Sequence, residues 1–261
     1  MDLGLKGKVA FITAASKGLG KAIALELAKE GVQLAISSRN KEQIEDTADF
    51  IRNQTGVRVE AMVADVSNPA EVHQFVETMA QKFGRVDILL INAGGPPSGE
   101  FMQLDDQAWE VAFQTNLMSI VRMVRETVPY MKENGGKILT IASSSVKVPI
   151  PGLVLSNTFR AGIVGLMKTL SVELAKDNIL VNIVAPGRIA TDRVAEIDAV
   201  KANKLGKTLQ QVQEDSEKSI PLGRYGKPEE FAKAVVFLAS DANSYITGST
   251  IMIDGGLVQA L

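Results

Sequence analysis

Short apolar runs alternate with longer amphipathic stretches along most of the 261-residue chain. The apolar runs predict strands at residues 8–13, 32–38, 57–63, 86–91, 136–142, 180–184 and 250–253. The stretches between them have a helical period and predict helices at residues 18–30, 41–54, 69–83, 106–132, 156–176 and 228–240. Strands separated by helices of this length are typical of βαβ units. The pattern therefore predicts an α/β fold, a doubly wound and mostly parallel sheet with helices on both faces.

The regular alternation breaks between Arg188 and Pro221. This segment is polar and charged, and it shows only weak helical patterns, at residues 194–205 and 209–218. The sequence contains no linker, repeat or low-complexity tract that would mark a domain boundary. We interpret residues 1–261 as a single domain, with residues 188–221 as a helical lid within it.

Composition narrows the classes of function. The chain has 28 Lys and Arg against 30 Asp and Glu, a formal net charge of -2, which does not favour binding of nucleic acids or anionic membranes. It has no cysteine and one histidine, His73, so cysteine chemistry and a histidine-rich metal site are excluded. There is no signal-peptide pattern at the N-terminus and no apolar run near the roughly 18 residues of a membrane span. We expect a cytoplasmic protein that takes a small-molecule substrate and binds no metal.

A glycine-containing loop joins the first predicted strand to the first helix. It reads Thr13-Ala14-Ala15-Ser16-Lys17-Gly18-Leu19-Gly20. Backbone N–H groups at a helix N-terminus attract a pyrophosphate, and glycines allow the ligand and the helix to come close. Such a loop is also an ordinary corner of an α/β protein, but it lies where a dinucleotide site needs it.

Further motifs follow in order, and together they resemble the short-chain dehydrogenase/reductase family over nearly the whole chain. The segments that carry the resemblance are Asp65-Val66, Asn92-Ala93-Gly94, Asn116, Pro186-Gly187 with Ile189 and Thr191, and Asp254-Gly255-Gly256. The branch of 3-oxoacyl-acyl-carrier-protein reductases is the most similar, through Pro221-Leu222-Gly223-Arg224 and Tyr245-Ile246-Thr247-Gly248.

The resemblance implies a nicotinamide-dependent oxidoreductase that forms a homotetramer through its two longest helices. It also implies which residues contact the cofactor: Thr13, Ala14, Ser16, Lys17, Gly18, Leu19, Gly20, Asp65, Val66, Asn92, Ala93, Gly94, Arg160, Pro186, Gly187, Ile189 and Thr191. One loop position departs from the family, which has glycine where this chain has Ala14. A positive φ costs alanine about 1–2 kcal/mol, so we expect either a negative φ at Ala14 or a shifted loop.

The end of the second predicted strand indicates which dinucleotide is preferred. A carboxylate there would bind the ribose 2′-hydroxyl of NAD, but residues 36–40 contain no acid. Arg39 could instead pair with a 2′-phosphate, with Ser38 beside it and Lys17 adding positive charge. We therefore predict NADP(H) over NAD(H), although an ordinary surface cation is the simpler interpretation of any single Lys or Arg.

The catalytic motif departs furthest from the family. In the resembled family a serine, a tyrosine 13 residues later and a lysine four residues after that reduce a carbonyl, with the tyrosine as proton donor. The same spacing here gives Ser143, Ser156 and Arg160. A serine hydroxyl is a far weaker acid than a phenol, and arginine cannot relay a proton. Arginine can still donate two hydrogen bonds to ribose hydroxyls.

Two interpretations of this centre stay open. In the first, Asn116, Ser143, Ser156 and Arg160 form an altered but working centre, with water as proton source or Lys147 as acid. In the second, the protein binds a nucleotide without catalysis. Lys147 is more simply a solvated loop lysine. Stiff apolar loops at residues 94–99 and 149–153, together with Phe101, either favour a partly apolar substrate or only pack against the lid. The resemblance implies that the substrate carries a carbonyl or secondary alcohol.

Overall fold

The computed structural model describes residues 2–260 and contains one parallel sheet of seven strands. The strand order is β3-β2-β1-β4-β5-β6-β7, and each pair of neighbours runs parallel. The strands are β1 (Val9–Ile12), β2 (Gln33–Ser38), β3 (Val59–Val63), β4 (Ile88–Ile91), β5 (Gly136–Ile141), β6 (Ile179–Pro186) and β7 (Thr250–Ile253). The order reverses between β1 and β4, the point at which open α/β sheets bind ligands.

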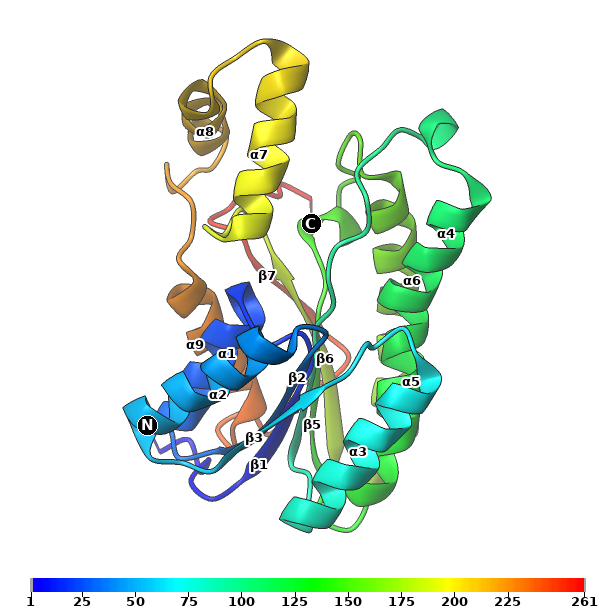
Figure 1. Cartoon of the computed structure of the whole chain (residues 1–261), viewed down its shortest axis with the longest axis vertical. Coiled ribbons are helices and arrows are strands. Elements are labelled where there is room, and N and C mark those ends of the chain that lie inside the picture. The colour runs from blue at the N-terminus through cyan, green and yellow to red at the C-terminus, as the bar shows by residue number, and fades with distance from the viewer. Residues whose placement is uncertain (1, 261) are drawn as a thin grey trace.

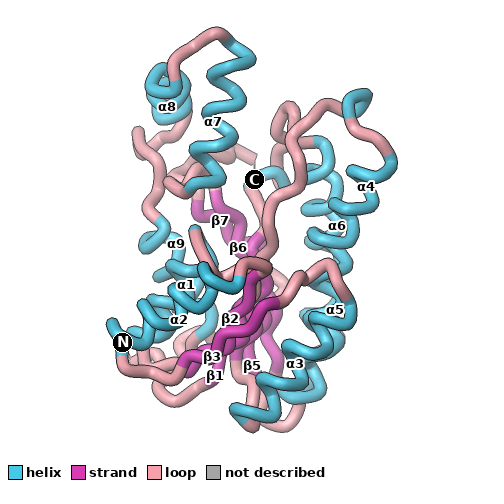
Figure 2. Tube along the Cα trace, viewed as in Figure 1, coloured by secondary structure: helices cyan, strands magenta, loops and turns pink. Residues whose placement is uncertain are grey.

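Helices cover both faces of the sheet (Figure 1, Figure 2), which confirms the predicted doubly wound fold. One face packs on α1 (Gly18–Lys29), α2 (Lys41–Thr55) and α9 (Pro228–Ala239). The other packs on α3 (Pro69–Phe83), α5 (Ser119–Thr127) and α6 (Val154–Glu173). Alternate residues of β1 supply the two cores, with Ala10 and Ile12 on one side and Phe11 on the other.

Capping residues close to each end determine where helix α3 begins and ends. Asn68 accepts a hydrogen bond from the Ala70 N–H at 3.0 Å, with Pro69 as the first helical residue, as the sequence predicts for α3. The helix ends at Gly84, which has a left-handed conformation. A glycine is favoured at such a position because it lacks the Cβ that would clash.

The predicted helix over residues 106–132 is wrong as a continuous element. The chain forms α4 (Asp106–Phe113), a π-helical segment η2 (Gln114–Met118) and then α5, followed by a 3-10 turn at Val128–Tyr130. Ser119 Oγ donates to the Thr115 carbonyl at 2.6 Å within this region. The apolar residues of the sequence keep a helical spacing through this region, so the sequence pattern does not reveal the π-helical segment. Single π-turns of this kind are frequent at functional sites.

Two further helices, α7 (Asp192–Leu205) and α8 (Leu209–Lys218), rise beyond the carboxyl ends of the strands (Figure 1). They form the segment predicted as a lid. Asp198 of α7 is fully buried and pairs with Arg188, and it accepts a hydrogen bond from the Tyr225 hydroxyl at 2.8 Å. This buried network ties the base of the lid to the sheet domain.

Candidate active site

A cleft of about 1250 Å³ opens at the carboxyl ends of the strands, around the switch point between β1 and β4. Most of the residues predicted from the sequence line it. These are Ala14, Ser16, Lys17, Gly18, Leu19, Ser38, Arg39, Asp65, Val66, Asn92, Ala93, Gly94, Ser143, Ser156, Arg160, Pro186, Gly187, Ile189 and Thr191. Thr13, Gly20, Asn116 and Lys147 are not among the lining residues.

Ala14 has a positive φ of 48°, and the loop is not shifted from its predicted place. The sequence predicted either a negative φ at Ala14 or a shifted loop, and both predictions are therefore wrong. The strained turn is held by hydrogen bonds from both sides. Asn92 Nδ2 donates to the Ala14 carbonyl at 3.1 Å, and the Ala15 N–H donates to the Ser37 carbonyl at 3.0 Å.

Thr13 and Gly20 help to fix the conformation of the loop, although neither residue lines the cleft. The Thr13 hydroxyl accepts from the Asn92 N–H at 2.9 Å and donates to the Asn92 carbonyl at 2.7 Å, which joins the ends of β1 and β4. A Cβ at Gly20 would lie 2.4 Å from the Ala14 carbonyl oxygen. Glycine at this position therefore lets the first turn of α1 approach the loop closely.

Two cations lie at the rim of the cleft, Arg39 just after β2 and Lys17 just before α1. Arg39 is exposed, and no ion pair to it is found within residues 2–260. Lys17 lies 4.0 Å from Asp192, with both side chains mostly exposed. Ser38 is buried, and its hydroxyl donates to the Asn40 carbonyl at 3.1 Å. Asp65 accepts hydrogen bonds from the backbone and side chain of Ser67.

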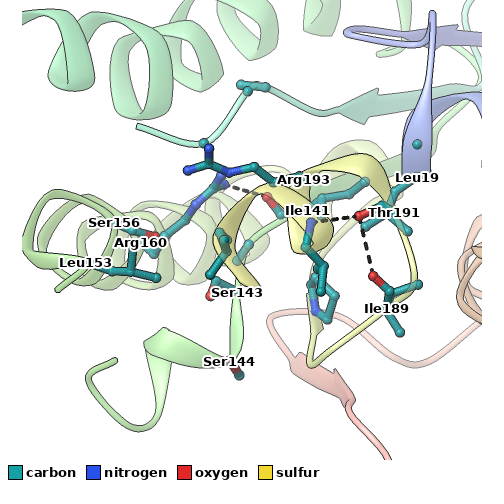
Figure 3. A pocket seen from close by; sticks show the side chains of 18 of the residues that line it. Leu19, Ile141, Ser143, Ser144, Leu153, Ser156, Arg160, Ile189, Thr191 and Arg193 are labelled. Carbon is teal, nitrogen blue, oxygen red and sulfur yellow. Dashed lines mark hydrogen bonds between the residues drawn. The ribbon is translucent and has the colours of Figure 1, made fainter. Parts of the chain in front are cut away.

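Arg160 carries a buried guanidinium at the opposite end of the cleft (Figure 3). The residue is 7% exposed, and its Nη1 donates to the Ile141 carbonyl at 2.6 Å. Its Nε is buried without a hydrogen-bond partner. Burial lowers the pKa of Arg160 to about 10, so the group keeps its charge at neutral pH. A buried cation with this little compensation is suited to a ligand that supplies acceptors.

Ser143 and Ser156 lie near Arg160 on the same wall (Figure 3). Ser143 Oγ accepts from the Ser145 N–H at 3.1 Å, which leaves the hydroxyl hydrogen free to donate into the cleft. The lining residues of the described chain include no tyrosine and no histidine. This end of the cleft therefore offers aliphatic hydroxyls and a guanidinium, with no side chain that titrates near neutral pH.

Two predicted catalytic residues lie outside the cleft. Asn116 belongs to the π-helical η2 and is 1% exposed; its Nδ2 donates to the Ala112 carbonyl, and its Oδ1 has no partner. Lys147 is exposed after the 3-10 turn η4 (Ser144–Val146). The position of Lys147 agrees with its interpretation as a solvated loop lysine.

The two predicted mouth loops are joined to each other. The Gly99 N–H donates to the Gly152 carbonyl at 2.7 Å, and Gly99 forms a parallel bridge with Leu153. Ile150 and Leu153 line the cleft as expected. Phe101 does not, because its ring packs edge-on against Trp109 at 6.2 Å between centroids, outside the cleft.

Arg193 is a cleft residue that sequence reasoning missed. It extends from the start of α7 (Figure 3). Its Nη2 donates to the Pro96 carbonyl at 3.0 Å. A Cβ at Gly95 would lie 3.2 Å from its Nε, so glycine leaves room for the guanidinium. A charged residue in a polar segment gives no sequence signal that it reaches across a cleft.

Two negative findings hold for the described residues. No helix is long and apolar enough to cross a membrane. Within residues 2–260, no group of His, Cys, Asp and Glu side chains is arranged to hold a metal ion.

The chain is similar to known oxidoreductases over its full length. A family model described as enoyl-(acyl carrier protein) reductase matches residues 13–258. The 3-oxoacyl-(acyl-carrier-protein) reductase of Thermotoga maritima is 36% identical over 255 residues, 97% of this chain and 99% of that protein. L-sorbose reductase from Gluconobacter frateurii, solved with NADPH and L-sorbose, is 34% identical, with a TM-score of 0.95 over the whole of both chains.

A third relative is also a solved structure. It is a short-chain oxidoreductase from Pseudomonas aeruginosa PAO1, described as containing an atypical catalytic centre. It is 30% identical, with a TM-score of 0.90 that covers 99% of this chain and 100% of that one. By fold, cleft and these similarities, the chain belongs to the short-chain dehydrogenase/reductase family of oxidoreductases.

Proposed function

We propose that the protein is an NADP(H)-dependent oxidoreductase acting on a carbonyl or secondary alcohol of a partly apolar substrate. The observation that carries the proposal is that one cleft joins the glycine loop and Arg39 to the buried guanidinium of Arg160. NADP(H) has a 2′-phosphate at its adenosine end, a pyrophosphate in the middle, and ribose hydroxyls beside the nicotinamide ring at the other end. The two ends of the cleft offer complementary groups.

The residues present fit such a cofactor. Gly18 has a positive φ of 57° at the start of α1, where backbone N–H groups can receive a pyrophosphate together with Ser16 and Leu19. Gly94 has open space where a side chain would project. The orphaned Nε of Arg160 fits a ribose hydroxyl. When bound, the cofactor supplies or accepts the hydride.

The remaining proposed contacts follow the walls of the cleft. Asp65 and Val66 would contact the adenine, and Asn92 and Ala93 the adjoining ribose. Four residues after β6 would line the nicotinamide, namely Pro186, Gly187, Ile189 and Thr191. At the centre, Ser143 and Ser156 would hold the substrate oxygen, and Asn116 would support this wall from within η2.

Preference for NADP(H) is proposed from the rim at the end of β2. Arg39 is free to form a bidentate pair with a 2′-phosphate, and Ser38 and Lys17 lie on the same lining. Relatives solved with NADPH support this choice.

The test compares NADPH and NADH binding by the quenching or enhancement of cofactor fluorescence. Arg39→Asp should lower NADPH affinity at least about tenfold relative to NADH, because it removes a contact and adds repulsion. Lys132→Asp, an exposed charge change in the turn before β5, is the matched control and should leave the ratio unchanged. If Arg39→Asp leaves the ratio of NADPH to NADH affinity unchanged, Arg39 does not bind the 2′-phosphate.

A purely nucleotide-binding role is the second candidate, because no phenol lies at the reaction end of the cleft. Tight NADPH binding with no oxidation across a broad panel of carbonyl compounds would favour it. Turnover of any member of the panel would exclude it.

We also propose a homotetramer. The helix α6 exposes Val172 at 72%, and α4 exposes Val111 at 48%, so apolar surface remains on the two helices expected to pair between subunits. Light scattering at micromolar concentration tests this, and a stable monomer would contradict it.

A further inference from the structure

We propose that Arg193 closes over the bound dinucleotide from the lid, with its guanidinium donating hydrogen bonds to the pyrophosphate that the glycine loop receives on the opposite side. The inference rests on the proposed function, because its ligand is the NADP(H) named there. It gives a role to a cleft residue that lies outside the glycine loop and outside the catalytic motif. It also makes Arg193 a determinant of how long the cofactor stays bound.

The start of α7 lies against the glycine loop. A Cβ at Gly18 would lie 3.9 Å from the Thr191 methyl group, and the Asp192 carboxylate lies 4.0 Å from the Lys17 ammonium group. Gly18 is the first residue of α1, where backbone N–H groups can receive a pyrophosphate. The residues that precede Arg193 are therefore placed directly beside the expected pyrophosphate.

The Arg193 side chain extends away from α7 (Figure 3). Its Nη2 donates to the Pro96 carbonyl at 3.0 Å, and a Cβ at Gly95 would lie 3.2 Å from its Nε. Gly95 and Pro96 follow β4, whereas the glycine loop follows β1, and these two strands are neighbours in the sheet. The side chain therefore spans the crevice between the ends of the two strands, where a dinucleotide is expected.

Other contacts hold the base of α7 in place. Ile189, just before the helix, forms a parallel bridge with Gly226. Within the helix, Asp198 is fully buried and pairs with Arg188. Arg193 therefore projects from an element whose position is fixed independently of the side chain itself, as precise binding of a ligand requires.

The guanidinium of Arg193 has donors to spare. It carries five N–H donors, and the bond to the Pro96 carbonyl uses one of them. The contact between Nη1 and Glu196 is long, at 3.5 Å, and both side chains are exposed, so this ion pair is weak. Within residues 2–260, Nε makes no hydrogen bond. Phosphate oxygens are charged acceptors, and a guanidinium binds them more strongly than it binds a neutral carbonyl.

The charges around the crevice also suit a pyrophosphate held from two sides. The pyrophosphate brings two negative charges, and the N-terminus of α1 supplies the equivalent of about half a positive charge. Helix α1 has no acidic residue in its first turn and no side-chain cap at its N-terminus. Lys17 is partly balanced by Asp192, which leaves Arg193 to supply further positive charge from the lid.

This arrangement affects the release of the cofactor more than its capture. A dinucleotide held by the glycine loop and by Arg193 can leave only after the guanidinium has let it go. We therefore expect the loss of affinity in an Arg193 variant to be mainly an increase in the dissociation rate. Stopped-flow displacement of NADPH measures that rate, and a loss carried mainly by the association rate would overturn the closing role.

Three ligands test the contact without turnover. NADPH has the whole cofactor, 2′-phospho-ADP-ribose keeps the pyrophosphate but lacks nicotinamide, and 2′-AMP keeps the 2′-phosphate but lacks the pyrophosphate. Isothermal titration calorimetry measures each affinity. Arg193→Met should weaken the first two ligands by at least about tenfold, as expected for a hydrogen bond to a charged group, and leave 2′-AMP within about twofold. Arg193→Lys, which keeps the charge without the planar group, should retain part of the affinity.

Lys218→Met is the matched control, because it removes one exposed charge from the same lid at a residue that does not line the cleft. It should leave all three affinities within about twofold. Thermal unfolding reports whether each variant folds. The Arg193 side chain is 43% exposed, so its removal opens no buried cavity. If Arg193→Met nevertheless fails to fold, Arg193→Gln replaces it, with the same losses expected.

Several outcomes would overturn the inference. Unchanged affinity of Arg193→Met for 2′-phospho-ADP-ribose would show that the guanidinium does not bind the pyrophosphate. A loss confined to NADPH would assign the contact to the nicotinamide half of the cofactor. Equal losses for 2′-AMP, or in Lys218→Met, would show a general effect of charge or of lid position.

A substrate is the other source of an anionic oxygen in this cleft. Carbonyl compounds that carry a carboxylate are therefore compared with their methyl esters at saturating NADPH. We expect Arg193→Met to leave the ratio of the two KM values unchanged. A rise in KM for the carboxylates alone, with unchanged cofactor affinity, would mean that Arg193 binds the substrate, and the inference would be wrong.

The same measurements separate this inference from the proposed function. If the wild-type protein binds NADPH and Arg193→Met binds it equally well, only the role of Arg193 is lost. If the wild-type protein binds neither NADPH nor 2′-phospho-ADP-ribose, the proposed function fails and the inference fails with it.

Discussion

The ammonium group of Lys204, near the end of α7, donates a hydrogen bond to Glu100 Oε1 at 2.8 Å. The two residues are 104 positions apart and belong to opposite sides of the cleft mouth, the lid and the loop after β4. Arg193 makes a second tie between the same two segments through the Pro96 carbonyl. Helix α7 is therefore held near both of its ends to the loop after β4.

Breaking the outer tie should speed the exchange of bound cofactor. Lys204→Met keeps much of the side-chain length but removes the charge, and we expect NADPH to dissociate roughly twofold to fivefold faster, in the range of exposed ion pairs. Stopped-flow displacement measures the rate. The difference from wild type should shrink at high salt, because exposed pairs are screened.

The control for that variant is Lys207→Met, which breaks the Lys207–Asp215 pair within the lid itself. It should leave the dissociation rate unchanged. The neighbouring Lys204 holds the pKa of Glu100 below its usual range, so the effect of Lys204→Met should persist above the ordinary carboxylate range and fade as the pH falls through that lowered pKa. If NADPH dissociates from Lys204→Met and Lys207→Met at equal rates at low salt, the Lys204–Glu100 hydrogen bond does not determine how fast NADPH is released.

Ala14→Gly should stabilise the protein. The substitution removes about 1–2 kcal/mol of strain at φ 48° and adds about 0.5–1 kcal/mol of unfolded-state entropy. The net gain is up to about 1.5 kcal/mol, and each 1 kcal/mol of gain would raise the melting temperature by roughly 2–4 °C. Ala15→Gly is the matched control, since Ala15 is buried without a positive φ and should be destabilised. A lower melting temperature for Ala14→Gly would mean that the loop is not strained in solution.

Restoring the family's acid should raise the rate of carbonyl reduction. Ser156→Tyr with Arg160→Lys places a phenol and an amine at the family spacing from Ser143. General acid catalysis contributes about 10²–10⁴-fold, so the rate of reduction of saturated ketones should rise by that order. The double variant must first be shown to fold and to bind NADPH. If it does both and still reduces saturated ketones no faster than wild type, the native centre does not lack a donor.

His73 should titrate above its ordinary range. Its Nδ1 lies 2.9 Å from Glu126 of α5, and this hydrogen bond and charge raise the pKa of His73 above 6.5. The small stabilisation that the contact gives is complete below the unfolded pKa of about 6.5 and is lost as the pH rises through the raised value. As the sole histidine, His73 gives one imidazole NMR signal to follow. Glu126→Gln should lower its pKa more than Glu77→Gln, whose carboxylate is 3.8 Å away.

The alternation of apolar runs and amphipathic stretches predicted the sheet and its covering helices because burial on both faces leaves a strong periodic signal. Helix N-caps such as Asn68 can also be predicted from the sequence, because a cap bonds to residues close to it along the chain. Many residues that line the cleft could be predicted for a related reason, because residues at the carboxyl ends of adjacent parallel strands meet at one edge of the sheet.

Features that depend on distant partners could not be predicted in this way. Ala14 keeps a positive φ because Asn92, 78 positions away, holds its carbonyl. The π-helix around Asn116 inserts a residue without disturbing the apolar pattern. The reach of Arg193 to Pro96 depends on where the lid lies. In each case the determining contact comes from another part of the chain.

The bridge between Gly99 and Leu153 has a consequence for altering substrate preference. Because the two mouth loops are hydrogen-bonded backbone to backbone, a residue inserted or a proline introduced on one of them disturbs the position of the other. In a library of variants changed only at residues 96–99, most variants would have the two loops out of their matched positions. The sequence that sets the shape of this entrance is therefore split between two short segments, and natural or directed evolution of its selectivity has to change them in matched pairs.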